Sequence, residues 1–364
     1  MATPTEEAIW EALGQVTDPD FNDKDVVTLG FIHDLQVTKN KVAFSFEPDT
    51  PLCPSRQTVA ERCREAVEGL EGVKKVSMNA EPHIQTHQVQ QGVQLLEGVK
   101  NVIAVASGKG GVGKSTTAVN LALGLGQCGA SVGILDADIY GPSIPRMLGV
   151  SGKPTSKDGK TLEPKEAYGL KAMSIGFLID EETPMVWRGP MVMQALEQLI
   201  GDTNWGELDY LVVDLPPGTG DTQLTLSQKV PLTGSVIVST PQDIALLDAR
   251  RGFQMFEKVG VPSLGIVENM SLFICPHCGE ETDIFSHGGG ESFANDYGVT
   301  YLGAVPLDAA IREQADNGHP TVAAAPDSRQ AEIYMTIANA VAVEIAKQAE
   351  DHSHKFPNIS IQAD

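Results

Sequence analysis

The sequence predicts an α/β fold in which a small N-terminal domain precedes a doubly wound, mainly parallel sheet. From residue 101 onward, short continuous apolar runs alternate with helical patterns, as in a parallel sheet that helices cover on both faces. The first of these runs, NVIAVAS, leads directly into GKGGVGKST, which matches the phosphate-loop motif in its strand–loop–helix context. The larger domain is therefore predicted to be a P-loop NTPase.

Length and composition agree with two folded domains. The chain has 364 residues, of which 41% are hydrophobic and 20% charged, the balance of an ordinary globular protein. We expect a small α/β domain over 1–80, a linker over 81–98, a P-loop ATPase domain over 99–350 and a disordered tail over 351–364. The linker is expected to make few contacts, because its five glutamines show little periodicity.

Alternating patterns define the elements of the small domain. We expect a helix over 5–14, strands over 26–37 and 41–46, a helix over 55–70 and a strand over 73–78. Ser55 is the expected N-cap of the second helix, and Gly72 follows that helix as a stop signal.

The larger domain repeats a strand-then-helix order. Its expected strands are NVIAVAS, SVGILDA, LKAMSI, YLVVD, GSVIVST and VPSLGIVEN, with helices beginning near Lys114, Pro190 and Asp243. The proline- and glycine-rich segment 151–166 is expected to be a surface excursion, and an amphipathic helix over 328–347 is expected to pack on the core.

The chain is strongly acidic. Its 26 basic and 48 acidic side chains give a net charge of −22 at pH 7, and residues 1–100 alone carry 9 basic and 16 acidic ones. Because the excess is spread along the chain, nonspecific binding to nucleic acid or to an anionic membrane is disfavoured. Adaptation to a salt-rich cytosol and ordinary acidity are two explanations that both stay open.

No part of the sequence predicts membrane insertion or export. No apolar run approaches the ~18 residues of a membrane span. The N-terminus, MATPTEEAIW, carries acidic residues where a secretory signal has cations and an apolar stretch. We therefore expect a cytoplasmic protein.

The glycine-rich loop predicts a nucleotide site. Glycines allow consecutive backbone N–H groups to converge on phosphate oxygens at a helix N-terminus. Lys114 is expected to reach the β- and γ-phosphates, and the Ser115 hydroxyl to bind Mg²⁺. The expected ATP-binding residues of the loop are Gly108, Lys109, Gly110, Gly111, Val112, Gly113, Lys114, Ser115 and Thr116.

Carboxylates follow two other predicted strands. Asp136 and Asp138 come at the end of SVGILDA, and Asp214 ends YLVVD in the Walker B pattern. In α/β sheets, residues at the carboxyl ends of strands face the ligand. Asp136 and Asp214 are therefore expected to support magnesium together with Ser115. The loop Pro216–Gly220 is predicted to sense the γ-phosphate.

The cysteines point to a metal site. Five cysteines in a chain of this length do not predict a disulfide scaffold. Cys275 and Cys278 form a CxxC pair, which can hold one soft metal or one edge of a cluster. Since the chain has no second CxxC, two copies would supply the four thiolates of an iron–sulfur cluster. A three-ligand zinc site completed by His287 is the alternative.

The phosphate loop resembles the deviant Walker A motif of the family that includes MinD, ParA, arsenical-pump ATPases and the nitrogenase iron protein. The resemblance implies that Lys109 reaches across a nucleotide-sandwich dimer to the partner's ATP. It also implies that Asp138 orients the attacking water and that Asn269, in VENM, contacts the adenine. For Asn269, an ordinary turn asparagine is the alternative.

A wider set of motifs resembles the Mrp/ApbC family of iron–sulfur cluster carrier ATPases over residues 95–345. These motifs are GKGGVGKST, LDADIYGPSIPRMLG, VWRGPM, VVDLPPGTGD, VENMS and CPHCG. The resemblance implies an ATP hydrolase that acts as a homodimer with ATP, Mg²⁺ and an iron–sulfur cluster, expected to be 4Fe–4S and to bridge two subunits at Cys275 and Cys278. It also implies recipient apoproteins, and scaffold proteins as further partners.

A positioning ATPase of the MinD/ParA type, with a structural zinc at the CxxC, is the alternative function. It would need a basic DNA-binding face or an amphipathic anchor, and the sequence shows neither. Neither nucleic acid nor membrane is therefore an expected partner.

The N-terminal domain has a resemblance of its own. DPDFNDKDVVTLGFI and TPLCPSRQTV resemble the small domain of iron–sulfur assembly factors, with DPD in place of the usual DPE. Cys53 stands where that domain often carries a reactive cysteine, and a buried, inert thiol is the alternative.

Overall fold

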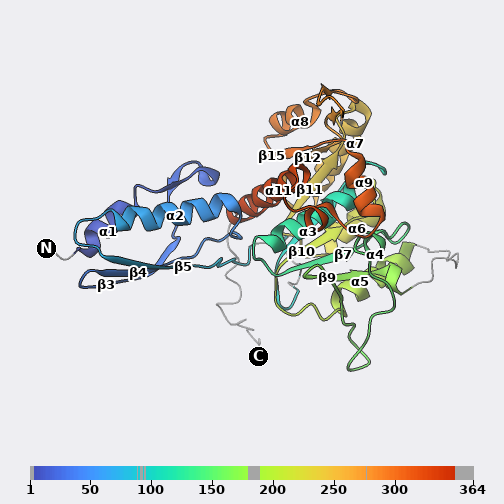
Figure 1. The fold of residues 1–364 in the computed structure, drawn as a ribbon. Coiled ribbons are helices and arrows are strands. Elements are labelled where there is room, and N and C mark those ends of the chain that lie inside the picture. Colours follow the sequence, from blue (N-terminus) through green and yellow to red (C-terminus); the bar gives the residue numbers. More distant parts are fainter. Residues whose placement is uncertain are drawn as a thin grey trace, which may run out of the picture.

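Two units, joined side by side, make up the computed structural model (Figure 1). The structure describes residues 4–348 apart from positions 88, 91–92, 94–95, 179–188 and 276. The expected tail over 351–364 and the first residues of VWRGPM therefore lie outside the described residues. The larger unit has the predicted α/β fold, and the smaller unit extends from one side of it.

An eight-stranded sheet forms the centre of the larger unit, in the order β15-β12-β11-β6-β10-β7-β9-β8. Its pairs are parallel except for β8 with β9. Every residue of β7 and β11 is buried, as continuous apolar strands require. The strands are β6 (Val99–Ala106), β7 (Val132–Asp136), β8 (Lys165–Ala167), β9 (Leu170–Ser174), β10 (Leu208–Asp214), β11 (Gly234–Ser239), β12 (Ser263–Asn269) and β15 (Tyr301–Val305).

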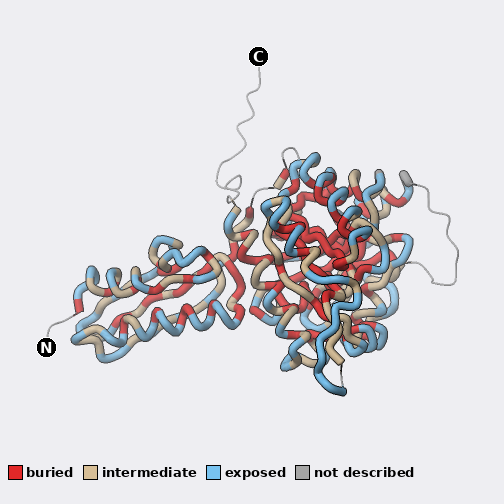
Figure 2. The backbone as a smooth tube through the Cα atoms, turned by 90° about the horizontal axis from the view of Figure 1, so that it is seen from above, coloured by how far each residue is buried: buried red, intermediate tan, exposed pale blue. Residues whose placement is uncertain are grey.

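Helices cover both faces of this sheet, and each face has its own apolar core. One core includes residues of α3 and α11, and the other includes residues of α5, α6, α7 and α8. The helices are α3 (Lys114–Gln127), α4 (Ile144–Met147), α5 (Gly189–Gly201), α6 (Asp221–Lys229), α7 (Asp243–Lys258), α8 (Gly289–Tyr297), α9 (Ala309–Asp316), α10 (Thr321–Ala324) and α11 (Arg329–Ala346). Figure 2 shows buried residues filling the interior of the larger unit and also running through the smaller one.

The N-terminal unit packs helices on a three-stranded sheet of order β3-β4-β5. Its elements are α1 (Glu6–Leu13), β1 (Thr17–Asp18), β2 (Lys24–Asp25), β3 (Ile32–Thr38), β4 (Lys41–Phe46), α2 (Pro54–Glu68) and β5 (Lys75–Ala80). A short 3-10 turn over Pro19–Phe21 follows β1.

Two local predictions for this unit are wrong. The strand expected over 26–37 begins only at Ile32, because the Asp25 carboxylate accepts the N–H groups of Val27 and Thr28 and folds that stretch into a turn. Helix α2 is capped by Cys53 rather than by Ser55, since Pro54 occupies its first position.

A buried arginine organises the DPD segment. Arg56 forms an ion pair with Asp18, and both side chains are fully buried. The guanidinium also lies over the Phe21 ring, 5.1 Å from its centroid, and donates to Asp20 at 3.3 Å. Burial lowers the pKa of Arg56 to about 10. Removing Arg56 would leave the buried Asp18 carboxylate unpaired, and removing Asp18 would leave the guanidinium with the longer contact to Asp20, so this network holds the loop against α2.

The two units meet along α11 and at a disulfide. The amide of Asn339 donates to Asp20 at 3.0 Å, and Val343 is part of the N-terminal core. Cys53 and Cys128 are joined by a disulfide, although the sequence analysis did not expect one. Beside it, the Leu52 N–H donates to the Cys128 carbonyl at 2.9 Å.

The segment 81–98 makes more contacts than the sequence analysis expected of a linker. Ile84 belongs to the core of the larger unit that includes α3 and α11, and His87 is fully buried between Asn101 and Asp49. The Gln90 amide donates to the carbonyls of Ser227 and Val230 at 2.6 and 3.0 Å, and its oxygen accepts the Leu232 N–H at 3.0 Å. The Ile84, Asn101 and Gln90 contacts attach the described part of the segment to the larger unit, and the contact of His87 with Asp49 links it to the N-terminal unit.

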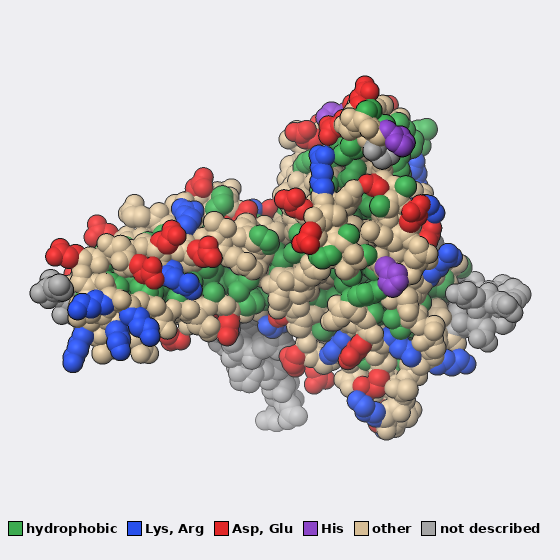
Figure 3. All heavy atoms as spheres, in the orientation of Figure 1, with side chains coloured by type: hydrophobic (Ala, Val, Ile, Leu, Met, Phe, Trp, Pro, Cys, Tyr) green, Lys and Arg blue, Asp and Glu red, His purple; other side chains and the backbone are tan. Residues whose placement is uncertain are grey.

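Acidic and basic side chains are interspersed on the face shown in Figure 3, but basic ones gather at the far end of the N-terminal unit. There the β3–β4 turn places Lys39 beside Lys41, and Lys41 pairs with Lys75 of β5. Among the described residues, no helix combines the length and apolar composition that crossing a membrane requires.

We predict that Gln90→Ala lowers the free energy of unfolding by about 1–3 kcal/mol, because it leaves buried backbone groups without partners. Denaturant titration of the whole chain measures this. Gln85→Ala is the matched control, since its side-chain amide bonds only the His83 carbonyl within the same segment; we expect a change within about 0.5 kcal/mol. Equal stability of the two variants would contradict the proposed attachment.

Candidate nucleotide site and cysteine pair

The phosphate loop joins β6 to α3 at the carboxyl edge of the sheet. Gly113 has a φ of 82°, in the left-handed region that glycine tolerates best, directly before the first residue of α3. A Cβ on Gly108 would overlap the backbone of Asp248 in α7, and a Cβ on Gly113 would overlap the Asn269 amide. These close approaches explain why glycine occupies both positions and fix the loop between α7 and β12.

Lys114 contacts a carboxylate across the loop. Its ammonium lies 2.6 Å from Oδ1 of Asp214 and 3.2 Å from the Ser115 hydroxyl, and Lys114 and Asp214 are both buried. Burial raises the pKa of Asp214, and the Lys114 charge opposes that rise. The three side chains predicted to serve phosphate and magnesium therefore come together.

Asp136 lies beside Asp214, because the two carboxylates end adjacent parallel strands at paired positions. One oxygen of Asp136 accepts the N–H groups of Ser143 and Ile144 at 3.0 and 3.1 Å and the Ser174 hydroxyl at 3.0 Å. Burial, followed by the neighbouring Asp214, raises the pKa of Asp136 to about 7. The pair concentrates negative charge at the edge of the sheet that the phosphate loop also occupies.

Asp138 lines a small cavity next to this pair. Its N–H donates to Asp136 at 3.2 Å, and its carboxylate accepts the Gly141 N–H at 3.3 Å. The cavity has a volume of about 210 Å³, and its lining includes part of the predicted γ-phosphate-sensing loop. The lining residues are Asp138, Tyr140, Pro216, Pro217, Gly220, Thr222 and Gln223.

Gln223 also lines this cavity, although no sequence motif marks it. This side chain is 2% exposed, and neither its oxygen nor its nitrogen has a hydrogen-bond partner among the described residues. A buried amide without partners next to Asp138 can bind water or a polar ligand group. Its position three residues after the loop Pro216–Gly220 was the available sequence signal.

Lys109 belongs to the phosphate loop, whereas Asn269 contacts that loop from the end of β12. Lys109 is half-buried, and in the part of the chain that the structure describes its ammonium has neither a hydrogen bond nor an ion pair. Its carbonyl accepts the Ser107 hydroxyl at 2.9 Å. Asn269, at the end of β12, donates its amide to the Val112 carbonyl at 2.8 Å, so it supports the loop from the side.

Cys275 and Cys278 lie on a hairpin between β13 (Phe273–Ile274) and β14 (Glu281–Thr282). Cys275 is half-buried, and Cys278 is exposed. The backbone N–H groups of His277 and Cys278 lower the pKa of the Cys275 thiol, in that order of importance. Amide hydrogen bonds that stabilise a thiolate favour a metal ligand.

In the part of the chain that the structure describes, no third metal ligand stands beside the two thiols. Among the described residues, no group of three or more histidine, cysteine, aspartate or glutamate side chains could hold one metal ion. His287 instead faces Asp283 at 3.8 Å, both of them exposed. Within the described residues, this hairpin therefore offers the two free thiols of Cys275 and Cys278.

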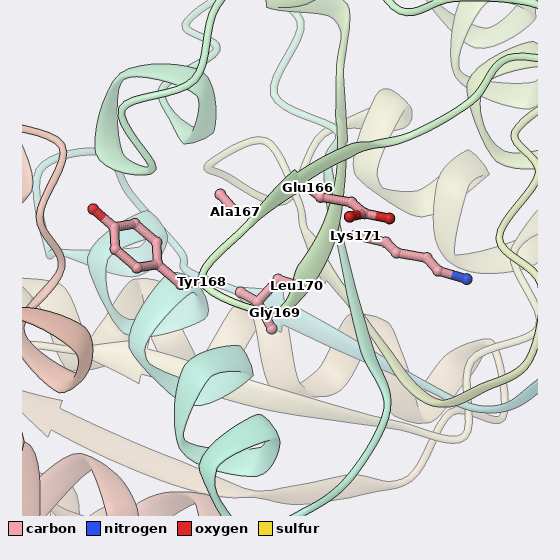
Figure 4. Close-up of a pocket in the computed structure, with 6 residues that line it drawn as sticks. All are labelled: Glu166, Ala167, Tyr168, Gly169, Leu170 and Lys171. Carbon is pink, nitrogen blue, oxygen red and sulfur yellow. The ribbon is translucent and has the colours of Figure 1, made fainter.

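A second hollow of about 290 Å³ lies at the β8–β9 turn, away from the phosphate loop (Figure 4). In this view Glu166 and Lys171 lie together, while Tyr168 points to the opposite side. The Tyr168 hydroxyl donates to the Gly318 carbonyl at 2.7 Å, which fixes the turn. This hollow lacks the paired carboxylates and glycine-rich loop of the nucleotide site.

Two protein-family models match this chain. One, described as the ParA family NUBPL iron-transfer P-loop NTPase, matches residues 98–342. The other, described as iron–sulfur cluster assembly protein, matches residues 6–78. The two matches fall on the larger and the N-terminal unit respectively.

Named relatives agree with these matches. An iron–sulfur cluster carrier protein of Synechocystis is 47% identical over 95% of this chain and 99% of its own length. The iron–sulfur cluster transfer protein NUBPL of Dictyostelium discoideum is 53% identical over 73% of this chain and 84% of its own.

Solved structures show the same fold. A nucleotide-binding protein of Archaeoglobus fulgidus in complex with ADP has a TM-score of 0.55 and 41% identity, over 61% of this chain and 88% of its own. The cell division ATPase MinD of Pyrococcus furiosus has a TM-score of 0.50 and 22% identity, over 66% of this chain and 98% of its own.

We predict that the wild-type chain loses stability relative to Asp136→Asn as pH rises. The folded-state pKa of Asp136 is about 7, against an ordinary value of 3.8, so folding favours the protonated form. The contribution of Asp136 to the free energy of unfolding is therefore complete below about pH 4. It decreases as the pH rises toward about 7, by up to about 1.4 kcal/mol per pH unit. Unfolding midpoints measured with a chelator test this, and parallel pH curves for the two proteins would contradict it.

Proposed function

The chain belongs to the NUBPL iron-transfer family of P-loop NTPases, and from this membership we propose that it hydrolyses ATP as a homodimer, binds an iron–sulfur cluster and passes the cluster to apoproteins. The observation that carries this proposal is the CxxC pair. Two backbone N–H groups stabilise the thiolate form of Cys275, and the Cys278 thiol is exposed. Both cysteines lie on the hairpin that follows β12, whose carboxyl end contacts the phosphate loop. A nucleotide site and a partly exposed cysteine pair that lie close together along the chain suit a nucleotide-controlled carrier.

The carboxylate cluster fits a divalent cation. The second oxygen of Asp214 is buried and has no hydrogen-bond partner among the described residues, and burial raises the pKa of both Asp136 and Asp214. Excess negative charge and a free carboxylate oxygen are what a hard cation neutralises. Ser115, Asp136 and Asp214 would hold Mg²⁺, which supplies charge neutralisation at the β- and γ-phosphates.

Lys114 and the loop amides bind the phosphates within one chain. Lys114 must then exchange its Asp214 contact for phosphate oxygens. Asp138 accepts a hydrogen bond from water at the γ-phosphate and orients it for attack. Gln223, which lines the same cavity, offers that water a second polar contact.

Lys109 completes the site in the partner subunit. Its ammonium has no ion pair within the described part of its own chain, while Lys114 already serves the phosphates of that chain. Across a two-fold interface, each Lys109 stabilises the negative charge that develops on the partner's transferring phosphoryl group. Hydrolysis therefore needs the dimer, whereas nucleotide binding does not.

The cluster is held at the two-fold axis. Each chain offers one thiolate pair, and a 4Fe–4S cluster takes four cysteine ligands. Two-fold symmetry brings the same hairpin of both subunits together. The chain between Asn269, which supports the phosphate loop, and Cys275 is short, so dimer closure on ATP changes the distance between the two pairs. Recipient apo iron–sulfur proteins then receive an exposed cluster, and no observation favours the positioning-ATPase alternative.

We predict that Lys109→Ala keeps ATP binding but loses turnover by about 10²-fold or more, as expected when one charge-stabilising group is removed. Lys114→Ala is expected to weaken both binding and turnover, because it removes the phosphate contact within the chain. Equilibrium binding of a fluorescent ATP analogue and phosphate release at saturating ATP separate the two effects. Wild-type turnover in Lys109→Ala would refute the role across the interface.

We predict that Cys275→Ala and Cys278→Ala each abolish iron retention after anaerobic reconstitution and leave ATP binding unchanged. The control is Cys63→Ala, because burial raises the pKa of that thiol to about 12 and keeps it protonated. Iron and sulfide analysis together with the visible absorption spectrum provide the measurement. Wild-type iron content in the Cys278→Ala protein would overturn the assignment.

A further inference from the structure

The disulfide between Cys53 and Cys128 stands apart from both the nucleotide site and the CxxC pair. Its two cysteines are 75 positions apart in sequence, with a Cα–Cα distance of 4.7 Å. Cys53 is 1% exposed and Cys128 4% exposed, so both sulfurs lie inside the joint between the units. Neither cysteine has a part in ATP hydrolysis or in cluster binding as described above.

The disulfide joins one helix of each unit. Cys53 caps the N-terminus of α2 in the small unit, and Cys128 caps the C-terminus of α3 in the large unit. Helix α3 begins at Lys114 in the phosphate loop. The bond therefore ties the small unit to the distal end of the phosphate-loop helix.

The other direct contacts between the small unit and the ATPase helices are weaker. They include the Asn339–Asp20 hydrogen bond, the packing of Val343 into the N-terminal core and the Leu52–Cys128 backbone bond. Figure 1 shows the small unit meeting the large one at one end only, beside α11. Interfaces between domains usually permit relative motion unless they are large and hydrophobic, and a covalent bond across one restricts that motion.

We propose that Cys53 and Cys128 are a reversible redox-modification site, whose oxidation locks the small unit onto the ATPase unit and whose reduction releases it. The oxidant class is a low-molecular-weight disulfide. In reducing cytosol such pairs stay as thiols unless the redox poise changes, so the lock reports oxidising conditions.

The chemistry balances as two exchange steps. The Cys53 thiolate attacks one sulfur of the small disulfide, whose S–S bond breaks to release one thiolate. The Cys128 thiolate then attacks the Cys53 sulfur of the mixed disulfide and releases the second thiolate. Both released thiolates take up the protons that the two cysteines lost. Two electrons pass from the cysteine pair to the small disulfide, which becomes two thiols.

Burial sets the order of events. Because both sulfurs are buried in the docked arrangement, a small disulfide reaches Cys53 only when the joint opens. Closing the joint then brings Cys128 to the mixed disulfide. Oxidation therefore captures the docked arrangement and does not create a new one.

The test equilibrates the full chain with glutathione buffers of increasing oxidised fraction, followed by acid quenching, alkylation in denaturant and peptide mapping. We expect a peptide linked through Cys53 and Cys128 to rise with the oxidised fraction in the wild type and in the matched control Cys63→Ala. Cys53→Ser and Cys128→Ser are expected to form no such peptide. Peptide mapping separates this bond from one between Cys275 and Cys278.

Hydrogen exchange on the same samples tests the lock itself. We expect the Leu52 amide and the amides of α11 near Val343 to exchange at least tenfold faster in the reduced wild type and in Cys53→Ser than in the oxidised wild type. The proposal is overturned if no linked peptide forms at any buffer ratio, if its amount does not change with the ratio, or if exchange at the joint is the same in both redox states.

Discussion

The contact between Lys114 and Asp214 is the interaction on which the nucleotide site depends. A parallel sheet brings the carboxyl ends of β6, β7 and β10 to one edge. The phosphate loop, Asp136 and Asp214 therefore lie close together. Two buried carboxylates side by side are unfavourable, and the buried Lys114 ammonium offsets only part of that cost. The edge is thus arranged for additional positive charge, which a cation and the partner's Lys109 would supply.

The same edge connects this electrostatic centre with the cysteine pair. Asn269 ends β12 against the phosphate loop, and the chain then runs into the hairpin that carries Cys275 and Cys278. Only a short stretch of chain separates Asn269, which contacts the phosphate loop, from Cys275. A shift of the loop on ATP binding can therefore move the two cysteines. In the proposed dimer, closure over two nucleotides also changes the distance between the two cysteine pairs, and with it the binding of the shared cluster.

Sequence patterns predicted much of this arrangement, and the failures have physical causes. The apolar strands, the glycine-rich loop and the aspartates at strand ends are local signals, so the sheet and the grouping of Lys114, Ser115 and Asp214 at its edge could be predicted. The direct Lys114–Asp214 ion pair was not predicted. The Cys53–Cys128 bond and the buried Gln90 depend on contacts between residues far apart in sequence, which no local pattern reveals. The strand expected over 26–37 failed because a side-chain turn at Asp25 competes with extension. Gln223 stands out only in the structure, where its side-chain amide is buried without a hydrogen-bond partner among the described residues.

Native mass spectrometry of the anaerobically reconstituted protein tests the central claim, that two chains share one cluster, most directly. The account predicts a dimer whose added mass equals one 4Fe–4S cluster per two polypeptides, and a cluster-free monomer for Cys278→Ala. A monomer that carries its own complete cluster, or a dimer that carries two, would contradict it.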